Sequence, residues 1–426
     1  MASSLLLIGC LLMGQAAGDD AALKAEIGKL VGRLDSNAKA QRDAAEAQLI
    51  QLGPRVLDLL PQPGPDMPAE VQQRLSRVRQ VLEQAAAGGA TGAARVTLRG
   101  RLPLARILAE IQRQTGNRMV RAANAQPAEP GGSEPIVTVD FNQTPFWSAL
   151  DTVLDQVGLT VYPFGQPGAI QVVAAGREQL PCSGRVALVG PLRIEPVRVI
   201  ARRDLRFSAA PTLRLSLEVA WEPRLRPIGL KQRLADVTAV DPAGQPIPVE
   251  NPGAVTEAFP SRDSAAEDMD VDLVLLPERP LRQIASLKGT FRAMLPGKVE
   301  TFRFTDLLAA RGVQKRIAAA TVTLDEVRRN ADTWEVRIRL RLDDPGDAFE
   351  SHRNWALANE ARLERPDGRA IACESSETTE RTPSGIGMSY VFRLDKPPAD
   401  LTFVYKPPGT VVTRDFPYEL KAIRLP

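Results

Sequence analysis

The densest group of residues that could do chemistry is an acidic segment, Asp343-Asp344-Pro345-Gly346-Asp347, with Glu350 close behind. Carboxylates around a glycine turn offer the hard oxygen ligands that calcium prefers. The spacing departs from that of an EF-hand loop, so the segment fits an acidic hairpin loop better than a dedicated metal site. We predict no resident cofactor. The candidate calcium ligands are Asp343, Asp344, Asp347 and Glu350.

Other catalytic patterns find little support. The chain has 1 histidine, His352, which excludes a histidine metal cluster and leaves a Ser/His/Asp triad a single base. It contains neither a G-x-S-x-G elbow nor a glycine-rich phosphate loop. A second acidic run at residues 267–272 alternates with apolar residues, which is typical of the polar face of a strand. We therefore predict no catalytic residues and no enzyme activity.

One aromatic pair could mark a binding surface. Phe146 belongs to an apolar helical stripe, and Trp147 lies beside it. Trp147 either covers the edge of a sheet or is an exposed contact for a peptide or carbohydrate. Phe146 and Trp147 are our candidate partner-binding residues.

Residues 135–175 are the stretch around which the chain can be organised. The first part alternates apolar and polar residues, which predicts a half-buried strand. A helix follows, with Thr144 as its N-cap, Pro145 at its first position and Gly158 at its end. Two short strands are expected at 159–162 and 169–173. The helix stripe consists of Phe146, Ala149, Leu150, Val153, Leu154 and Val157.

The same order of strand, proline and amphipathic helix occurs just upstream, with Pro103 in the place of Pro145. This doubled pattern resembles the short N-terminal (STN) domain of secretins and TonB-dependent transducers over residues 93–176. Gly158-Leu159-Thr160 also fits the exit into that family's next strand. The other interpretation is a generic two-layer α/β domain. The matching residues are Val96, Leu98, Pro103, Leu104, Ile107, Leu108, Val137, Val139, Pro145, Phe146, Ala149 and Leu150.

In the resembling family this domain lies on the periplasmic side of an outer-membrane channel and contacts partner proteins. The resemblance therefore implies recognition of an envelope protein partner. Neither a secretin ring domain nor a long barrel pattern follows residue 176, which puts pore formation in doubt.

The N-terminus indicates export. Residues 5–13 form a short apolar core and Ala16-Ala17-Gly18 supplies small residues, so we expect a cleaved signal peptide at 1–18 and a periplasmic or secreted protein. Leu7-Ile8-Gly9-Cys10 also looks like a lipoprotein box, so a lipid anchor at Cys10 is the alternative that we favour less. We expect no transmembrane span. Cys182 and Cys373 could pair after export, or remain buried thiols.

The rest of the chain divides into two regions that differ in the spacing of their hydrophobic residues. Residues 19–88 carry helical stripes and look like a single HEAT-type repeat or a helical hairpin. From about residue 190 the period becomes two, in two turn-rich blocks at 190–306 and 316–426 with similar patterns. We expect two tandem antiparallel β-sandwiches, immunoglobulin-like in layout only.

The predicted fold class is multidomain α+β: a helical hairpin, a small βαβ-type two-layer domain and two β-sandwiches. The formal net charge of +3 implies no nucleic-acid partner. We predict a non-enzymatic exported envelope protein that acts as a protein-binding or scaffold module. One alternative is a carbohydrate-active or other hydrolase with carboxylates between the sandwiches. A third is a structural or adhesive spacer.

Overall fold

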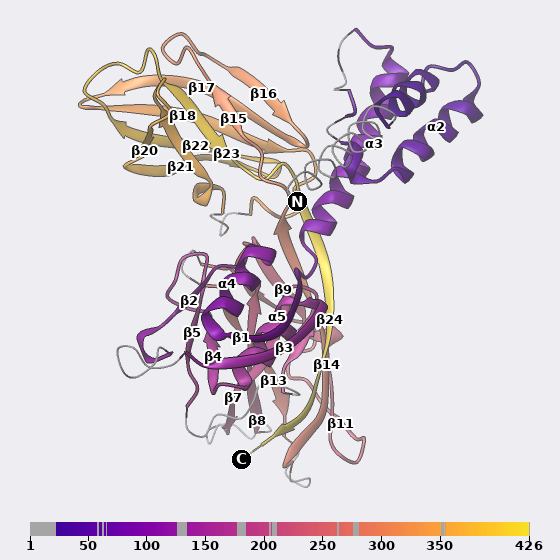
Figure 1. Cartoon of the computed structure of the whole chain (residues 1–426), viewed down its shortest axis with the longest axis vertical. Coiled ribbons are helices and arrows are strands. Elements are labelled where there is room, and N and C mark those ends of the chain that lie inside the picture. Colours follow the sequence, from indigo (N-terminus) through magenta and orange to yellow (C-terminus); the bar gives the residue numbers. More distant parts are fainter. Residues whose placement is uncertain are drawn as a thin grey trace, which may run out of the picture.

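The computed structural model is a mixed α+β fold, rich in strands, with helices at its N-terminal end (Figure 1). It describes residues 23–57, 59–61, 64, 66–125, 134–176, 185–203, 206, 211–261, 264–275, 281–350, 353 and 355–425. The expected signal at 1–18 and the residues Cys10, Cys182 and His352 lie outside these ranges. Cys373 has a half-buried free thiol. Within the described ranges, no helix has the length and apolar character to cross a membrane.

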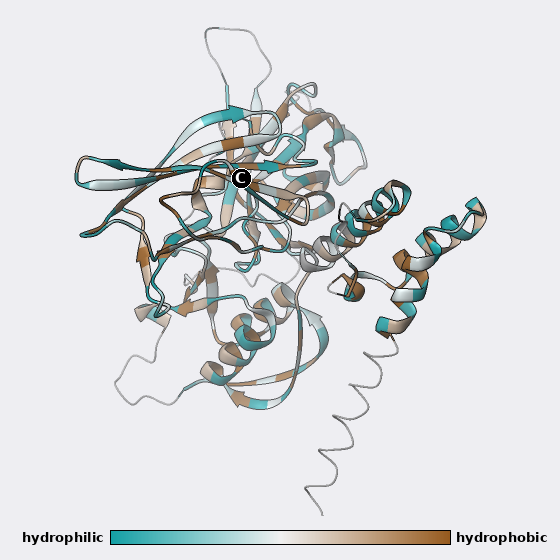
Figure 2. Cartoon of the chain, turned by 90° about the horizontal axis from the view of Figure 1, so that it is seen from above, coloured by the Kyte–Doolittle hydropathy of each residue, from teal (hydrophilic) through white to brown (hydrophobic). Residues whose placement is uncertain are grey.

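The N-terminal helices form a segment with its own core. A helix at residues 23–33 is followed by α2 (Lys39–Gln51), the 3-10 helix η1 (Pro54–Val56) and α3 (Ala69–Ala90). Hydrophobic and hydrophilic residues alternate along these helices, which stand to one side of the sheets in Figures 1 and 2. The buried apolar residues form one cluster, as the helical stripes predict: Ile27, Leu30, Leu34, Ala45, Leu49, Val56, Leu60, Val71, Leu75, Val78 and Leu82.

The α/β unit follows α3. Its elements are β1 (Arg95–Pro103), α4 (Leu104–Thr115), β2 (Met119–Arg121), η2 (Ala123–Ala125), β3 (Ile136–Pro145), α5 (Phe146–Asp155), β4 (Leu159–Tyr162) and β5 (Ile170–Ala174). Strands β1 and β3 form an antiparallel two-stranded sheet. Strand β5 lies between β2, to which it is parallel, and β4, to which it is antiparallel.

The two strand–proline–helix units fold in the same way. Pro103 has φ −59° and ψ 141°, and Pro145 has φ −56° and ψ 144°. Each proline therefore has an extended backbone and is the last residue of its strand, and the helix begins at the next residue. The helix at 146 thus starts one residue later than a Thr144 cap predicts, because Pro145 itself is the non-helical cap residue.

Two central sheets form the middle of the molecule. One has 4 strands in the order β13-β8-β7-β6, and the other has the order β11-β10-β14-β9-β12 with β24 beside β14. Their buried residues and those of the α/β unit form a single hydrophobic cluster. The strands are β6 (Ala187–Val189), β7 (Leu192–Arg202), β8 (Thr212–Trp221), β9 (Gly229–Arg233), β10 (Thr238–Val240), β11 (Pro246–Ile247), β12 (Val255–Ala258), β13 (Ala266–Val274), β14 (Gln283–Pro296) and β24 (Val411–Arg424), with the 3-10 helix η3 (Leu234–Asp236) before β10.

The inserted sheets are two further sheets built from residues between β14 and β24, with a core of their own. One has the order β15-β23-β19-β20 and the other β16-β17-β18-β22-β21. They lie above the central sheets in Figure 1. Their elements are β15 (Phe302–Phe304), β16 (Val313–Ile317), β17 (Ala320–Asn330), β18 (Thr333–Leu342), η4 (Trp355–Ala358), β19 (Glu360–Glu364), β20 (Ala370–Ala372), β21 (Ser375–Thr382), β22 (Gly385–Arg393) and β23 (Thr402–Lys406).

The expected tandem boundaries are wrong at both ends of the inserted sheets. Strand β24, expected in a block at 316–426, pairs with β14 of the central sheets from Pro296–Val411 to Gln283–Arg424. Strand β15, expected in the block at 190–306, pairs with β23 of the inserted sheets. One unit is therefore inserted into the other, and the long strands β14 and β24 run side by side between them (Figure 1).

Candidate functional site

The aromatic pair lies in the core. Phe146 is 0% exposed and Trp147 is 1% exposed, and their rings meet edge to face with centroids 5.0 Å apart. The indole Nε1 of Trp147 donates a hydrogen bond to the carbonyl oxygen of Pro191, 2.9 Å away, just before β7. The prediction that Phe146 and Trp147 contact a partner is therefore wrong. They join the α/β unit to the central sheets.

The four acidic residues of the segment 343–350 do not lie together in the structure. Asp343 pairs with Arg316 at 2.5 Å, and Asp344 is exposed. Asp347 and Glu350 instead converge with Glu257, so that one carboxylate oxygen of each lies within 4.8 Å of the others. The structure thus brings together only two of the four predicted calcium ligands, and adds an acid from a distant strand.

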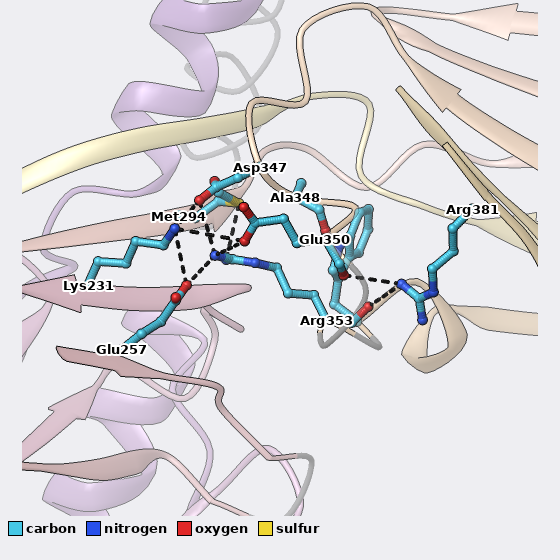
Figure 3. A network of polar contacts seen from close by, with 9 residues as sticks. Lys231, Glu257, Met294, Asp347, Ala348, Glu350, Arg353 and Arg381 are labelled. Atoms are coloured by element: carbon cyan, nitrogen blue, oxygen red, sulfur yellow. Dashed lines mark hydrogen bonds and ion pairs between the residues drawn. The ribbon is translucent and has the colours of Figure 1, made fainter. Parts of the chain in front are cut away.

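Two cations complete this group, which we call the junction cluster: Lys231, Glu257, Asp347, Glu350 and Arg353 (Figure 3). Lys231 on β9 and Glu257 on β12 are cross-strand partners in the central sheets. The other three residues come from the segment between β18 and η4 of the inserted sheets. The junction cluster therefore connects the two pairs of sheets.

The cations stand between the carboxylates. The Nη2 atom of Arg353 bonds to Glu257 and lies 3.2 Å from Asp347 and 3.3 Å from Glu350. The ammonium of Lys231 contacts Asp347 and lies 3.3 Å from Glu257. The Arg353 side chain is 0% exposed, whereas the three acids are partly exposed. Arg353 is thus the buried centre of the cluster.

Packing fixes the Arg353 guanidinium from several sides. Its carbon lies 5.5 Å from the centroid of the Phe259 ring, a cation–π arrangement. A Cβ at Gly229 would come within 2.4 Å of Nη1, so a larger residue there would displace the guanidinium. On the other side, Nη1 of Arg381 donates to the backbone carbonyl oxygen of Arg353 at 2.9 Å.

Neighbouring charges and hydrogen bonds favour the ionised forms of Asp347 and Lys231. Burial acts to raise the pKa of Asp347, but the hydrogen bond from Lys231 and the charge of Arg353 outweigh it and hold that pKa below its ordinary value. Burial acts to lower the pKa of Lys231, and its bonds to Asp347 and Glu257 raise it above the ordinary value. A general acid needs a raised pKa, so Asp347 is unsuited to that role.

The junction cluster is a network of ion pairs between the central and the inserted sheets. The acids do converge between the two pairs of sheets, as the hydrolase alternative requires. However, Lys231 and Arg353 already supply the positive charge that a calcium ion would bring to Glu257, Asp347 and Glu350. The geometry therefore supports a structural role, in which these ion pairs attach the inserted sheets to the central sheets.

The second acidic run lies on a sheet surface. Met269, Val271 and Leu273 of β13 are buried. Asp272 alternates with them and pairs with Arg214 of β8 at 2.8 Å. The prediction of a polar strand face at 267–272 is confirmed.

A strand edge of the α/β unit is the remaining candidate for partner binding. Within the described ranges, β1 and β3 pair only with each other. On the β1 side, the Gln114 side chain accepts from the amide of Thr97 at 2.8 Å and donates to its carbonyl oxygen at 2.9 Å. On the β3 side, one contact of 3.3 Å joins the Gln156 amide to the carbonyl oxygen of Thr138. The edge of β3 is the more open of the two.

Neither the protein-family models nor the curated proteins contain a match to this chain.

Proposed function

We propose that this protein is a non-enzymatic, exported envelope protein that binds another protein through its α/β unit. The central and inserted sheets would act as a scaffold of two β-sandwiches, one inserted into the other. Export is supported by the signal-like residues 1–18 alone. Partner binding is supported by the resemblance to the STN domain and by the open edge of β3.

The β3 edge is the observation that carries this proposal. The side chains of Val137, Val139 and Phe141 are buried against the helices, which fixes the register and orientation of β3. Thr138 and Asp140, which are exposed, alternate with them. A strand that is held rigidly on one face and unpaired along one edge can accept an extended peptide, whose main chain extends the sheet.

The alternation of the ladder predicts which backbone groups point outward. The carbonyl oxygen of Thr138 bonds to Gln156 and not to β1, so Thr138 and Asp140 direct their backbone groups away from β1. Their ladder partners Arg101 and Arg99 direct their backbone groups away from β3, along the edge of β1 where Gln114 bonds to Thr97. A partner strand would therefore bond to the backbone of Thr138 and Asp140.

A pair of matched proline variants tests this proposal. Asp140→Pro removes an outward N–H from β3, whereas Arg99→Pro removes one from β1. Both break the same exposed ion pair of 3.1 Å, because Arg99 and Asp140 face each other. Immobilised residues 19–426 would be mixed with envelope extract, and captured proteins compared after circular dichroism has verified folding.

We expect wild type and Arg99→Pro to capture the same protein and Asp140→Pro to lose it. Equal capture by both variants would exclude the β3 edge as the contact. Capture of nothing by the wild-type chain would contradict the binding function itself and favour the structural spacer.

A further inference from the structure

A hollow of about 410 Å³ lies on one face of the five-stranded inserted sheet. It is independent of the β3 edge and of the junction cluster. Its residues form two adjacent rows that cross the strands, one through Thr323, Arg339 and Gly387 and the other through Thr321, Arg341 and Gly385. Its volume lies within the range of roughly 300–1,000 Å³ that small-molecule sites occupy.

Two glycines form the floor of the hollow. Gly385 and Gly387 flank Ile386 on β22, whose side chain is buried in the core on the opposite face of the sheet. A side chain at Gly385 would come within 2.6 Å of the Leu340 carbonyl oxygen, and one at Gly387 within 2.8 Å of Thr379. The depression thus depends on two positions where no side chain fits.

Two polar groups in the hollow lack a partner in the described structure. Thr321 is 3% exposed, and its hydroxyl makes no hydrogen bond there. Arg341 is exposed, and no carboxylate in the described ranges lies within ion-pair distance of it. Its neighbour Arg339 is different, because it holds Asp325 with two nitrogens at 2.7 and 3.0 Å. A buried hydroxyl without a partner is costly unless a ligand or water completes it.

We propose that this hollow binds a small polar acid, whose carboxylate is bound by the side chains of Arg341 and Thr321. A planar guanidinium recognises a carboxylate with two parallel hydrogen bonds, and a threonine hydroxyl can donate a third. Glu380 lines the opposite side on β21 and would accept from a hydroxyl or ammonium group of the same ligand. The lining includes no aromatic ring, so recognition is by charge and hydrogen bonds.

Sugar acids and amino acids share this chemistry, and two probes distinguish them. Isothermal titration calorimetry of residues 19–426 would use glucuronate and glutamate, with glucose as the neutral counterpart of the first. We expect one of the two acids to bind with a stoichiometry of one and glucose to give no heat. Arg341→Ala should weaken binding at least tenfold, and Thr321→Val severalfold.

The matched control is Arg393→Ala, which removes the same charge from the same sheet outside the hollow, where Arg393 pairs with Glu374 at 2.8 Å. It should change the affinity less than twofold. Arg341→Gln replaces Arg341→Ala if that variant does not fold. The proposal is overturned if neither acid binds the intact protein, or if the Arg341 variant binds as tightly as Arg393→Ala.

Discussion

The α/β unit and the inserted sheets are attached to the central sheets in opposite ways. The α/β unit shares with them a hydrophobic core that includes Trp147, and adds the buried ion pair between Asp151 and Arg193 at 3.2 Å. The inserted sheets keep a separate core and meet the central sheets through the junction cluster, the strands β14 and β24, and a small apolar cluster of Ile228, Met294 and Ala348.

The difference indicates which parts can fold or move independently. Burial of apolar area is the main source of stability, so units that share a core should unfold together. Charged contacts in partly exposed positions contribute much less. We therefore expect the α/β unit and the central sheets to unfold as one body, and the inserted sheets as another.

Removal of β24 should have the largest effect, because it should unfold the central sheets and leave the inserted sheets folded. A chain that ends at Gly409 lacks the whole partner of β14 and the buried side chains of Phe416, Tyr418, Leu420 and Ile423. Scanning calorimetry should then show the transition of the inserted sheets and no transition of the central sheets. Deletion of residues 425–426 alone is the control. A truncated chain that retains both transitions would contradict the pairing of β24 with β14.

Trp147→Ala should have the next largest effect. The change leaves a cavity in the shared core and removes the partner of the Pro191 carbonyl, so it should cost about 3–5 kcal/mol in the free energy of unfolding. Denaturant titration should show the α/β unit and central sheets destabilised together. Trp334→Ala, a half-buried site in the inserted sheets, should affect only the other transition. Separate unfolding of the α/β unit would argue against a shared core.

Arg353→Met tests the junction cluster. Three carboxylates would then face Lys231 alone, and the cost should be about 1–3 kcal/mol, because the acids are partly exposed and can be hydrated. Limited proteolysis should cut the segment between β18 and η4 faster, with both cores still folded. The control Arg316→Met, which loses an exposed pair with Asp343, should cost less than about 1 kcal/mol. An unchanged cleavage rate in Arg353→Met would show that the cluster does not hold the sheets together.

The smallest expected effect is a pH dependence beside the α/β attachment. Burial raises the pKa of Glu218 on β8 from 4.5 to about 7, and the neighbouring charges of Glu195 and Asp268 add to the rise, although Arg193 opposes it. A raised carboxyl pKa stabilises the protein fully below the unfolded value of 4.5, and this contribution is lost as the pH rises through 7.

Wild type should therefore lose stability between pH 5 and pH 8, and Glu218→Gln should lose less, by on the order of 1 kcal/mol. Denaturant unfolding at four pH values measures this difference. Burial also raises the pKa of Asp151, against the opposing charge of Arg193, so the contribution of this carboxyl to the pH dependence has the same sign. Identical slopes in the two proteins would contradict a raised pKa at Glu218.

The sequence predicts where helices and strands lie better than it predicts which strands pair with each other. Alternation predicts strands such as β3 and β13, and helical stripes predict α4 and α5, because these patterns are local. The alternation of β24 is the same whichever sheet it joins, so its pairing with β14 could not be read from it. The spacing of Asp347 and Glu350 could suggest a site, but Glu257 and Lys231 lie far upstream and carry no signal that links them to it. Phe146 and Trp147 were misassigned because an aromatic pair looks alike at a surface and at a packed junction.

Site-specific photo-crosslinking tests the central claim most directly. A crosslinking residue would be placed at Thr138 on the edge of β3, and separately at its ladder partner Arg101 on the opposite edge, that of β1. Both positions are exposed, so they differ only in the edge that they report. Irradiation of the full chain in its native envelope should give a discrete adduct with another protein from position 138 and none from position 101. Adducts of equal yield from both positions, or from neither, would contradict partner binding through β3.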